Sequence, residues 1–494
     1  MNVKLNKLVV AALASTSLMG FGGLAHADST NDIVNALVMK GVLTEEEGAL
    51  LTKGHSGETG AAKKEKDTTV HASSKMAIRG YLQVRNTALL GGENSNKGIN
   101  LWSDRSVGNV YSMADKDKNF IIRRARVIIS GSAGDRLDYY IQPDFASSAS
   151  TTNNVAQLRD YYGDLNITKD KVHRIRVGQS KVPYGFENLQ SSQNRLALDR
   201  ADAFNSAVRD ERDLGAFYYY TPDNVQKLFK EIQDGGLKHS GNYGMFALGA
   251  YNGQGANQQD QNSNYHTVAR LTYPWKTESG QIYEAGIQGY TGKYVRSTSA
   301  YRRDVTQTDG STYATTPENG CAAAGCKDER VGISFMMYPM PFGLQGEWNW
   351  GKTPGLDTSL GANVDVSSAS GAQNFSKGKI VNKNLNGGYI QTMYKIDHVK
   401  IGDTDGTVIP FVRWQYFDGF SKAEANAPQN KINDWELGAE WQIAPEVEFV
   451  AYYHHMNRSN LVTGSTSSTT NPSGNADYAR FKADAIRMQL QYNF

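Results

Sequence analysis

The stretch Ile486-Arg487-Met488-Gln489-Leu490-Gln491-Tyr492-Asn493-Phe494 decides the fold of this chain. Apolar and aromatic residues occupy every second position in it, and polar residues occupy the positions between them. A strict period of two predicts a β-strand with one apolar and one polar face. A strand of a soluble β-sandwich would alternate in the same way, so the rest of the chain has to distinguish a soluble from a membrane setting.

The amino terminus has the pattern of a secretory signal peptide over residues 1–27. Lys4 and Lys7 form its basic start, an apolar run follows, and Ala25-His26-Ala27 is a small-x-small cleavage site. This run is too short for a transmembrane anchor, and no other segment approaches the roughly 20 apolar residues that a spanning helix needs. A secreted chain can still be integral to a membrane when its strands close into a barrel, because every backbone group is then paired.

The charge of the mature chain is balanced. Removing Lys4 and Lys7 from the 52 basic residues leaves 50, which equals the 50 acidic residues. Bulk charge therefore indicates no nucleic-acid partner, and any preference for an ion has to come from the positions of individual charges.

From residue 76 onward the pattern predicts about sixteen strands, an even number that suits a bacterial outer-membrane barrel. The predicted strands are 76–89, 119–131, 135–145, 156–167, 172–183, 213–221, 242–252, 264–275, 280–291, 328–339, 342–352, 386–397, 406–418, 431–443, 445–457 and 480–494. Tight turns and long polar links alternate between them, which places the long loops at one rim. The stretch 222–241 departs from this rule with a helix-like segment, and a missed pair of short strands there leaves eighteen strands as an alternative.

Charged residues share one face of the predicted strands. Arg174 and Arg176 alternate with Ile175 and Val177, for example, whereas Arg123 falls on the apolar register and is expected at a rim. A Lys or Arg that faces lipid at the midplane costs about 2–4 kcal/mol, so the charged face is predicted to line the lumen. At this strand number the lumen is too wide for side chains to fill. The fold is therefore predicted to be an all-β, transmembrane antiparallel β-barrel around a water-filled pore, with an aromatic girdle that includes Tyr218, Tyr219, Tyr220, Trp275, Tyr338, Trp414 and Tyr416.

Residues 28–74 precede the barrel, which we assign to 75–494. A short amphipathic helix around Ile33 and Leu37, a capping box at Thr44-x-x-Glu47 and a polar linker predict a periplasmic helical extension. Whether this extension is an oligomerising or wall-binding module or a poorly ordered spacer stays open.

Several segments resemble the family of phosphate-selective porins O and P. They are Arg123-Arg124-Ala125-Arg126, Gln142-Pro143-Asp144-Phe145-Ala146, Leu158-Arg159-Asp160-Tyr161, Arg212-Asp213-Leu214-Gly215 and, as the most specific, Val177-Gly178-Gln179-Ser180-Lys181-Val182-Pro183-Tyr184-Gly185-Phe186-Glu187. The resemblance implies a trimeric, sixteen-stranded channel in the outer membrane of a Gram-negative bacterium. It also implies that the third long loop, here 184–212, folds inward as a constriction.

The same resemblance implies passive diffusion of small anions such as phosphate. Arg124, Arg126 and Lys181 match basic positions of the family, and a few fixed cations at a dielectric between those of water and protein outweigh thermal energy. The candidate pore and anion-binding residues are Arg124, Arg126, Arg174, Arg176, Lys181, Arg195, Arg200, Arg209 and Arg212. Acidic residues are interleaved with the loop arginines, which departs from a purely basic lining. A general-diffusion or sugar porin with little ion selectivity therefore remains the alternative.

Three further expectations concern structure and partners. Cys321 and Cys326, spaced C-x4-C in an oxidising compartment, are predicted to form a small disulfide, with no metal or cofactor. Phe494 is the candidate assembly signal, by which the barrel-assembly machinery would recognise the last strand; the other expected partners are outer-membrane lipid and two further copies of the chain. Motifs such as Gly-x-Ser-x-Gly and His-Glu-x-x-His are absent, so an outer-membrane enzyme or an adhesin is a weaker alternative than a channel.

Overall fold

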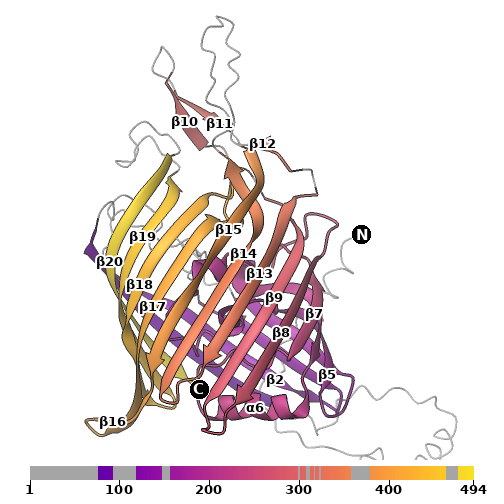
Figure 1. Ribbon diagram of the computed structural model, residues 1–494, viewed down its shortest axis with the longest axis vertical. Helices are drawn as coiled ribbons and strands as arrows, with labels where there is room; N and C mark the ends of the chain where they lie inside the picture. Colours follow the sequence, from indigo (N-terminus) through magenta and orange to yellow (C-terminus); the bar gives the residue numbers. More distant parts are fainter. Residues whose placement is uncertain are drawn as a thin grey trace, which may run out of the picture. The chain divides into compact units, whose positions relative to one another are not determined.

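The computed structural model describes residues 76–92, 118–146, 156–296, 298, 301–306, 312–315, 318–321, 324–357, 379–462 and 477–494. The predicted signal peptide, helical extension and linker lie outside these described residues. Within them, sixteen long strands form a closed antiparallel β-barrel, which confirms the predicted fold class (Figure 1).

The barrel strands follow one another around the wall in sequence order. They are β1 (Met76–Gly91), β2 (Lys118–Ala133), β3 (Leu137–Asp144), β4 (Gln157–Asn166), β5 (His173–Lys181), β6 (Arg212–Tyr220), β7 (Phe246–Tyr251), β8 (His266–Lys276), β9 (Ile282–Tyr294), β13 (Cys326–Met337), β14 (Phe342–Asp357), β15 (Lys379–Tyr394), β17 (Thr404–Phe420), β18 (Gln429–Ala444), β19 (Val447–Val462) and β20 (Asp477–Asn493). The last strand pairs with the first from Tyr81↔Asn493 to Gly91↔Asp484, so the sheet has no open edge at this seam.

Shorter strands lie at the two rims of the barrel (Figure 1). At the long-loop end, β10 (Tyr301–Thr306) pairs with β11 (Thr312–Thr315), and β12 (Glu318–Asn319) lies parallel to the start of β15. At the tight-turn end, β16 (Ile396–Ile401) pairs with the start of β17 and carries this hairpin beyond the barrel. All sixteen predicted strands are present, with ends that differ from the prediction by up to seven residues, at the start of β15.

The described helices are short and lie between β5 and β7. They are α4 (Phe186–Leu189), α5 (Asp202–Asn205), the 3-10 turn η2 (Arg209–Glu211) and α6 (Asp223–Asp234). In the part of the chain that the structure describes, no helix combines the length and apolar character required to cross a bilayer. The eighteen-strand alternative is wrong, because the stretch 222–241 contains α6 instead of two strands.

The alternation of side chains along the strands is the reverse of that in a soluble barrel. On β8, Arg270 and Thr272 point inward and are 2% and 1% exposed, whereas Leu271 and Tyr273 point outward and are 50% and 54% exposed. Large apolar side chains are exposed in the same way on β5, β9, β13 and β18, as lipid contact requires. The alternation therefore places polar groups inside and excludes the soluble sandwich.

The predicted aromatic girdle is correct only in part. Trp414 and Tyr416 lie outside and stack with Trp348, whose ring is parallel to that of Tyr416 within 4° at 6.0 Å between centroids. Tyr219 and Tyr338 are instead completely buried on the inner face, and the Tyr338 hydroxyl donates to Glu284 at 2.8 Å. Tyrosine suits both faces of the wall, so its presence near a strand end does not determine which face it occupies.

Candidate functional site

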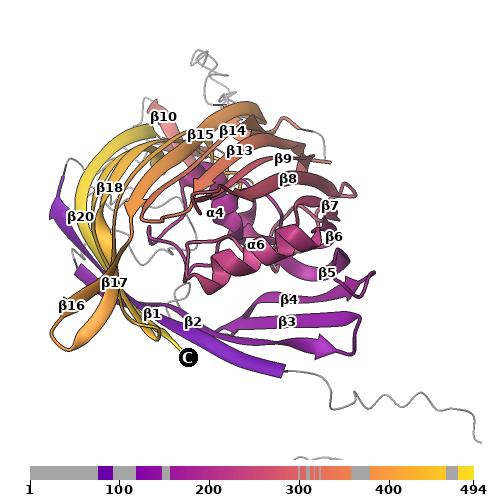
Figure 2. The ribbon, with the colours of Figure 1, turned by 60° about the horizontal axis from the view of Figure 1, so that its bottom comes forward.

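The segment that follows β5 leaves the wall and enters the lumen. Gly185 has φ of 81°, and a Cβ atom on it would lie 2.7 Å from Phe204 Cδ1, so this turn requires glycine. The backbone N–H groups of Phe186 and Glu187 then donate to the carboxylate of Glu347 on β14, at 2.5 and 2.8 Å. The predicted loop 184–212 thus contacts the wall far from its own strands, and Figure 2 shows α4 within the ring of strands.

Acidic residues of the loop hold it in place. Glu187 accepts from Arg413 on β17 at 2.7 and 3.1 Å, and Asp202 pairs with Arg458 on β19 at 3.2 Å. Glu211 pairs with Arg200 and with Arg212, the latter at 2.7 Å. These three acids are almost completely buried, so the acidic residues that interrupt the basic loop act as anchors on arginines.

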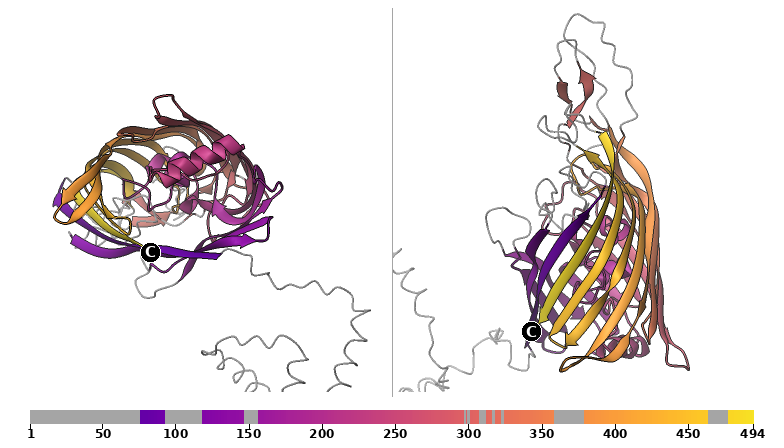
Figure 3. Two further views of the ribbon diagram at one scale, coloured as in Figure 1. Left: turned by 90° about the horizontal axis from the view of Figure 1, so that it is seen from below. Right: turned by 90° about the vertical axis from the view of Figure 1, so that its left-hand side faces the viewer.

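We define the floor as residues 223–243, which comprise α6 and the segment that follows it. The floor lies beneath the loop. Val225, Phe229 and Ile232 recur at helical spacing and are buried against Phe186 and Leu198 of the loop and the inner face of β9 to β19. Figure 3, seen from below, shows the helix lying across the mouth of the barrel. Loop and helix therefore share one apolar core inside the lumen, and they occupy much of the space that the strand number alone would leave to water.

Within the floor, the segment after α6 contacts both sides of the barrel. The Lys238 ammonium pairs with the buried Glu440 of β18, and Gln190 Nε2 of the loop donates to the Lys238 carbonyl at 3.1 Å. Asn194 of the loop contacts His239 at 3.2 Å, while Arg174 of β5 donates to the Asn242 carbonyl. The floor is thus fixed to β5, to β18 and to the loop.

A cavity of about 300 Å³ remains between the loop and the wall formed by β1 to β6. Five cations line it, and one carboxylate, Asp160, lies among them. The lining cations are Arg79, Arg126, Arg176, Lys181 and Arg212. The remaining lining consists mainly of loop residues 189 and 191–194, floor residues 239–243, Tyr140 and Tyr162. The cavity is therefore basic on the wall side and neutral on the loop side.

Three of the four lining arginines are oriented by a carboxylate of a nearby strand. Arg126 Nε lies 2.7 Å from Asp144, and Arg176 binds both oxygens of Asp164 at 2.7 and 2.8 Å. Arg212 lies 2.8 Å from Asp160. Lys181 differs, because its ammonium donates to the carbonyls of Leu189 and Gln190 at 2.8 and 2.9 Å and, among the described residues, has no carboxylate within ion-pair distance.

The other predicted basic residues do not line this cavity. Arg124 donates to Gln83 at 2.8 Å, and Arg195 Nη2 donates to the Leu198 carbonyl at 3.4 Å. Arg200 is buried in its pair with Glu211, and Arg209 reaches outward to Gln258 at 3.0 Å. Of the nine predicted residues, Arg126, Arg176, Lys181 and Arg212 lie together on one cavity, and Arg174 adjoins it through Asn242.

Arg123 does not lie at a rim, contrary to the sequence-based expectation. The pairing of β1 with β2 shifts between Gln83 and Val84, and the extra residue on β2 is Arg123. This β-bulge turns Arg123 inward beside Arg124, and both are buried, at 4% and 3% exposure. The simple period of two fails here because a bulge adds one residue to one strand.

Tyr140 and His239 are among the cavity residues that lay outside the sequence-based prediction. Tyr140 was visible on the polar register of its strand, but aromatic character alone did not distinguish a lining residue from a girdle residue. His239 carried no signal, because it follows α6 and its position depends on the fold of the floor. Burial, together with the nearby Lys238 and Lys181, lowers the pKa of His239 to about 4.

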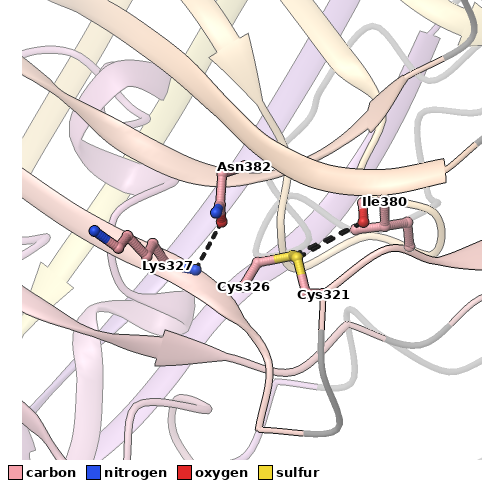
Figure 4. The surroundings of a disulfide bond; sticks show 5 residues. All are labelled: Cys321, Cys326, Lys327, Ile380 and Asn382. Atoms are coloured by element: carbon pink, nitrogen blue, oxygen red, sulfur yellow. Dashed lines mark hydrogen bonds between the residues drawn. A yellow bond between two sulfur atoms is a disulfide. The ribbon is translucent and has the colours of Figure 1, made fainter.

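Cys321 and Cys326 form a disulfide at the long-loop end (Figure 4). Their Cα atoms are 5.1 Å apart, and the Cys321 Sγ atom lies 3.7 Å from the Ile380 carbonyl oxygen at the start of β15. The Lys327 N–H donates to Asn382 of the same strand at 2.8 Å.

Phe494 lies at the opposite end, beside Gly80, and 68% of it is exposed. Among the described residues, no group of His, Cys, Asp and Glu is arranged to hold a metal ion.

Comparison with known proteins agrees with this architecture. The model of the family described as phosphate-selective porin O and P matches residues 96–494. Similar solved structures include OmpT of Vibrio cholerae (11% identity, 85% of this chain and 98% of that chain, TM-score 0.42). The outer membrane channel DcaP of Acinetobacter baumannii has 11% identity over 85% of this chain and 97% of that chain, with TM-score 0.43. The anion-selective porin from Comamonas acidovorans has 10% identity over 85% of this chain and 100% of that chain, with TM-score 0.44. No curated protein matches the chain.

Proposed function

The chain belongs to the family of phosphate-selective porins O and P, and on that premise we propose that it conducts small anions such as phosphate through a narrow basic channel. As a member of this family it is an outer-membrane porin of a Gram-negative bacterium. The proposal concerns what the pore prefers and which residues set that preference.

One observation carries the proposal: the cavity beside the loop has five lining cations and a single lining carboxylate. In a narrow lumen the effective dielectric lies below that of water, so each fixed charge acts on a passing ion with an energy above thermal energy. Arginine adds a planar donor fork that fits the oxygens of phosphate in pairs. An anion entering this space is therefore stabilised, and a cation is repelled.

The pairing of these arginines favours a second candidate function, a general-diffusion pore. Asp144, Asp160 and Asp164 neutralise much of the charge of Arg126, Arg212 and Arg176. Facing rows of opposite charge orient polar solutes without strong ion selection. We propose a moderate anion preference because Lys181 and Arg79 have no carboxylate within ion-pair distance among the described residues.

The decisive variant is Lys181→Gln, because Lys181 lines the cavity and its ammonium donates to the carbonyls of Leu189 and Gln190. The full chain is inserted in a planar bilayer, and the reversal potential is measured in a potassium chloride gradient. We expect wild type to favour chloride and Lys181→Gln to shift the reversal potential toward cations. Phosphate added to wild type should reduce the chloride current.

Lys230→Gln is the matched control, since Lys230 is an exposed lysine on α6 that pairs with Asp234 at 2.7 Å. It should leave the reversal potential unchanged. Equal permeability of wild type to both ions, with no effect of phosphate, would support the general-diffusion pore instead.

We also propose that the chain assembles as a homotrimer, that its third long loop is the constriction, and that its last strand is recognised by the barrel-assembly machinery. The apolar exterior supports lipid and subunit contact, and the anchors of the loop on β14, β17 and β19 support a fixed constriction. Chemical cross-linking of the detergent-extracted protein tests the subunit number.

A further inference from the structure

Asp199 differs from every residue around it in the loop. From Arg195 to Phe204, each residue is buried except Asp199. The Asp199 side chain is 12% exposed, whereas those of its partners Arg85 and Arg487 are 0% and 1% exposed. Water and ions therefore meet the Asp199 carboxylate before they meet the two arginines behind it.

The carboxylate is held by an arginine cluster that we define as Arg85, Arg123 and Arg487. Arg85 Nη1 donates to both oxygens of Asp199, at 3.0 and 3.2 Å, and Arg487 donates to Oδ2. Arg123, turned inward by the bulge in β2, adds a third positive charge nearby. Burial alone would raise the pKa of the Asp199 carboxyl, but the three arginines hold that pKa well below its usual range.

This geometry is the one that a free oxyanion would adopt on the same cluster. Two carboxylate oxygens accept from guanidinium groups that converge from β1 and β20, and phosphate oxygens are bound by arginine through the same kind of contact.

We propose that Asp199 is a specificity-determining residue, a built-in carboxylate that competes with passing oxyanions for the arginine cluster. This inference rests on the proposed function, since it concerns how tightly the same pore holds its anions. A carboxylate attached to the loop competes at a high effective concentration, which weakens the binding of any free anion. Conduction requires an ion to leave as readily as it enters, so weaker binding favours flux.

The other anchoring acids do not have this role. Glu187, Asp202 and Glu211 are almost completely buried, and so are their arginine partners Arg413, Arg458 and Arg200. Asp202 provides the matched comparison, because it is an aspartate of the same loop paired with a strand arginine, Arg458, at 3.2 Å. Arg458 also pairs with Asp434, so it keeps a carboxylate partner when Asp202 is replaced.

The test compares wild type, Asp199→Asn and Asp202→Asn, each as the full chain in a planar bilayer. Asparagine keeps the size of aspartate and one acceptor oxygen, but it removes the charge. We expect Asp199→Asn to raise the anion-to-cation permeability ratio severalfold, and to lower severalfold the concentration of inorganic phosphate that halves the chloride current. Asp202→Asn removes an anchor of the loop but leaves Arg458 paired with Asp434, so it should shift both quantities far less than Asp199→Asn does.

Several outcomes would overturn the inference. If Asp199→Asn raises conductance to both ions and leaves the permeability ratio unchanged, Asp199 only anchors the loop. The same conclusion follows if Asp202→Asn and Asp199→Asn shift the ratio equally. A wild type without anion preference would contradict the proposed function, whereas the inference would still stand if Asp199→Asn alone created that preference. Resistance of each folded variant to unfolding in detergent shows that it has retained the barrel.

Discussion

At the scale of single residues, His239 tests whether the cavity keeps a constant charge. It lines the cavity, contacts Asn194 at 3.2 Å, and has its pKa lowered to about 4 by burial and by Lys238 and Lys181. An unperturbed histidine would gain a proton near pH 6.5 and add a positive charge to the lining. His239 should therefore stay neutral, and the anion preference should be constant between about pH 5 and pH 8.

The measurement is the reversal potential at several pH values, with His239→Gln as the comparison. Both proteins should give the same flat profile. An anion preference of wild type that rises as the pH falls through about 6.5, and that is lost in His239→Gln, would contradict the prediction. The stability of the folded protein should depend on pH through the same group. The pKa of His239 is lower in the folded than in the unfolded chain, so the unfolded chain binds the proton more tightly. The contribution of His239 to stability is therefore constant above about pH 6.5 and falls as the pH drops toward 4.

At the scale of elements, α6 determines how much of the lumen is open. Phe229 is 8% exposed and packs in the core that the helix shares with the loop. Phe229→Asp places an unpaired carboxylate in that core, and removing a buried phenylalanine costs about 3–5 kcal/mol. The helix should leave the mouth, and single-channel conductance should increase.

Asn224→Asp is the control for this variant, since it adds the same charge at an exposed position of the same helix. Its conductance should equal that of wild type. If Phe229→Asp conducts like wild type while remaining folded, α6 does not limit the pore.

The same elements show which parts of the fold were predictable. Each strand has its own alternation of polar and apolar residues, so the inward direction of Arg176 and the outward direction of Val177 could be inferred from the residues next to them. The helix from Val225 to Ile232 was also visible as a local pattern. The position of this helix inside the lumen could not be predicted, because it depends on contacts with residues such as Ile282 and Met393 that are distant in the sequence.

The candidate site was predictable to a smaller extent for a related reason. Arg126, Arg176, Lys181 and Arg212 lie on strands or at strand ends, where the register determines their direction. Arg195, Arg200 and Arg209 do not line this cavity, and the sequence pattern carries no sign of their direction. That direction depends on anchors of the loop such as the contact of Glu187 with Arg413, which is 226 residues away in the sequence. Pattern reasoning therefore succeeds where the period of two is unbroken along a strand, and it fails at the bulge that contains Arg123 and in the enclosed loop.

At the scale of the whole molecule, the barrel closes where its two described ends meet. The Gly80 N–H donates to the Phe494 carbonyl at 2.7 Å, the Phe494 N–H donates back at 3.0 Å, and the β1–β20 ladder continues this seam. The Phe494 ring adds little to closure, since 68% of the residue is exposed. Exposed side chains away from special features change stability by about 0.5 kcal/mol or less.

Phe494→Ser therefore separates assembly from stability. If the ring is an assembly signal, the variant should reach the outer membrane severalfold less than wild type, yet purified protein refolded in detergent should unfold at nearly the wild-type temperature. Tyr492→Ser is the control, because Tyr492 shares the outward face of β20 and is 42% exposed. It should assemble normally in cells. An equal loss of assembly and of thermal stability in Phe494→Ser would mean that the ring closes the seam, and the role of an assembly signal would then have no support.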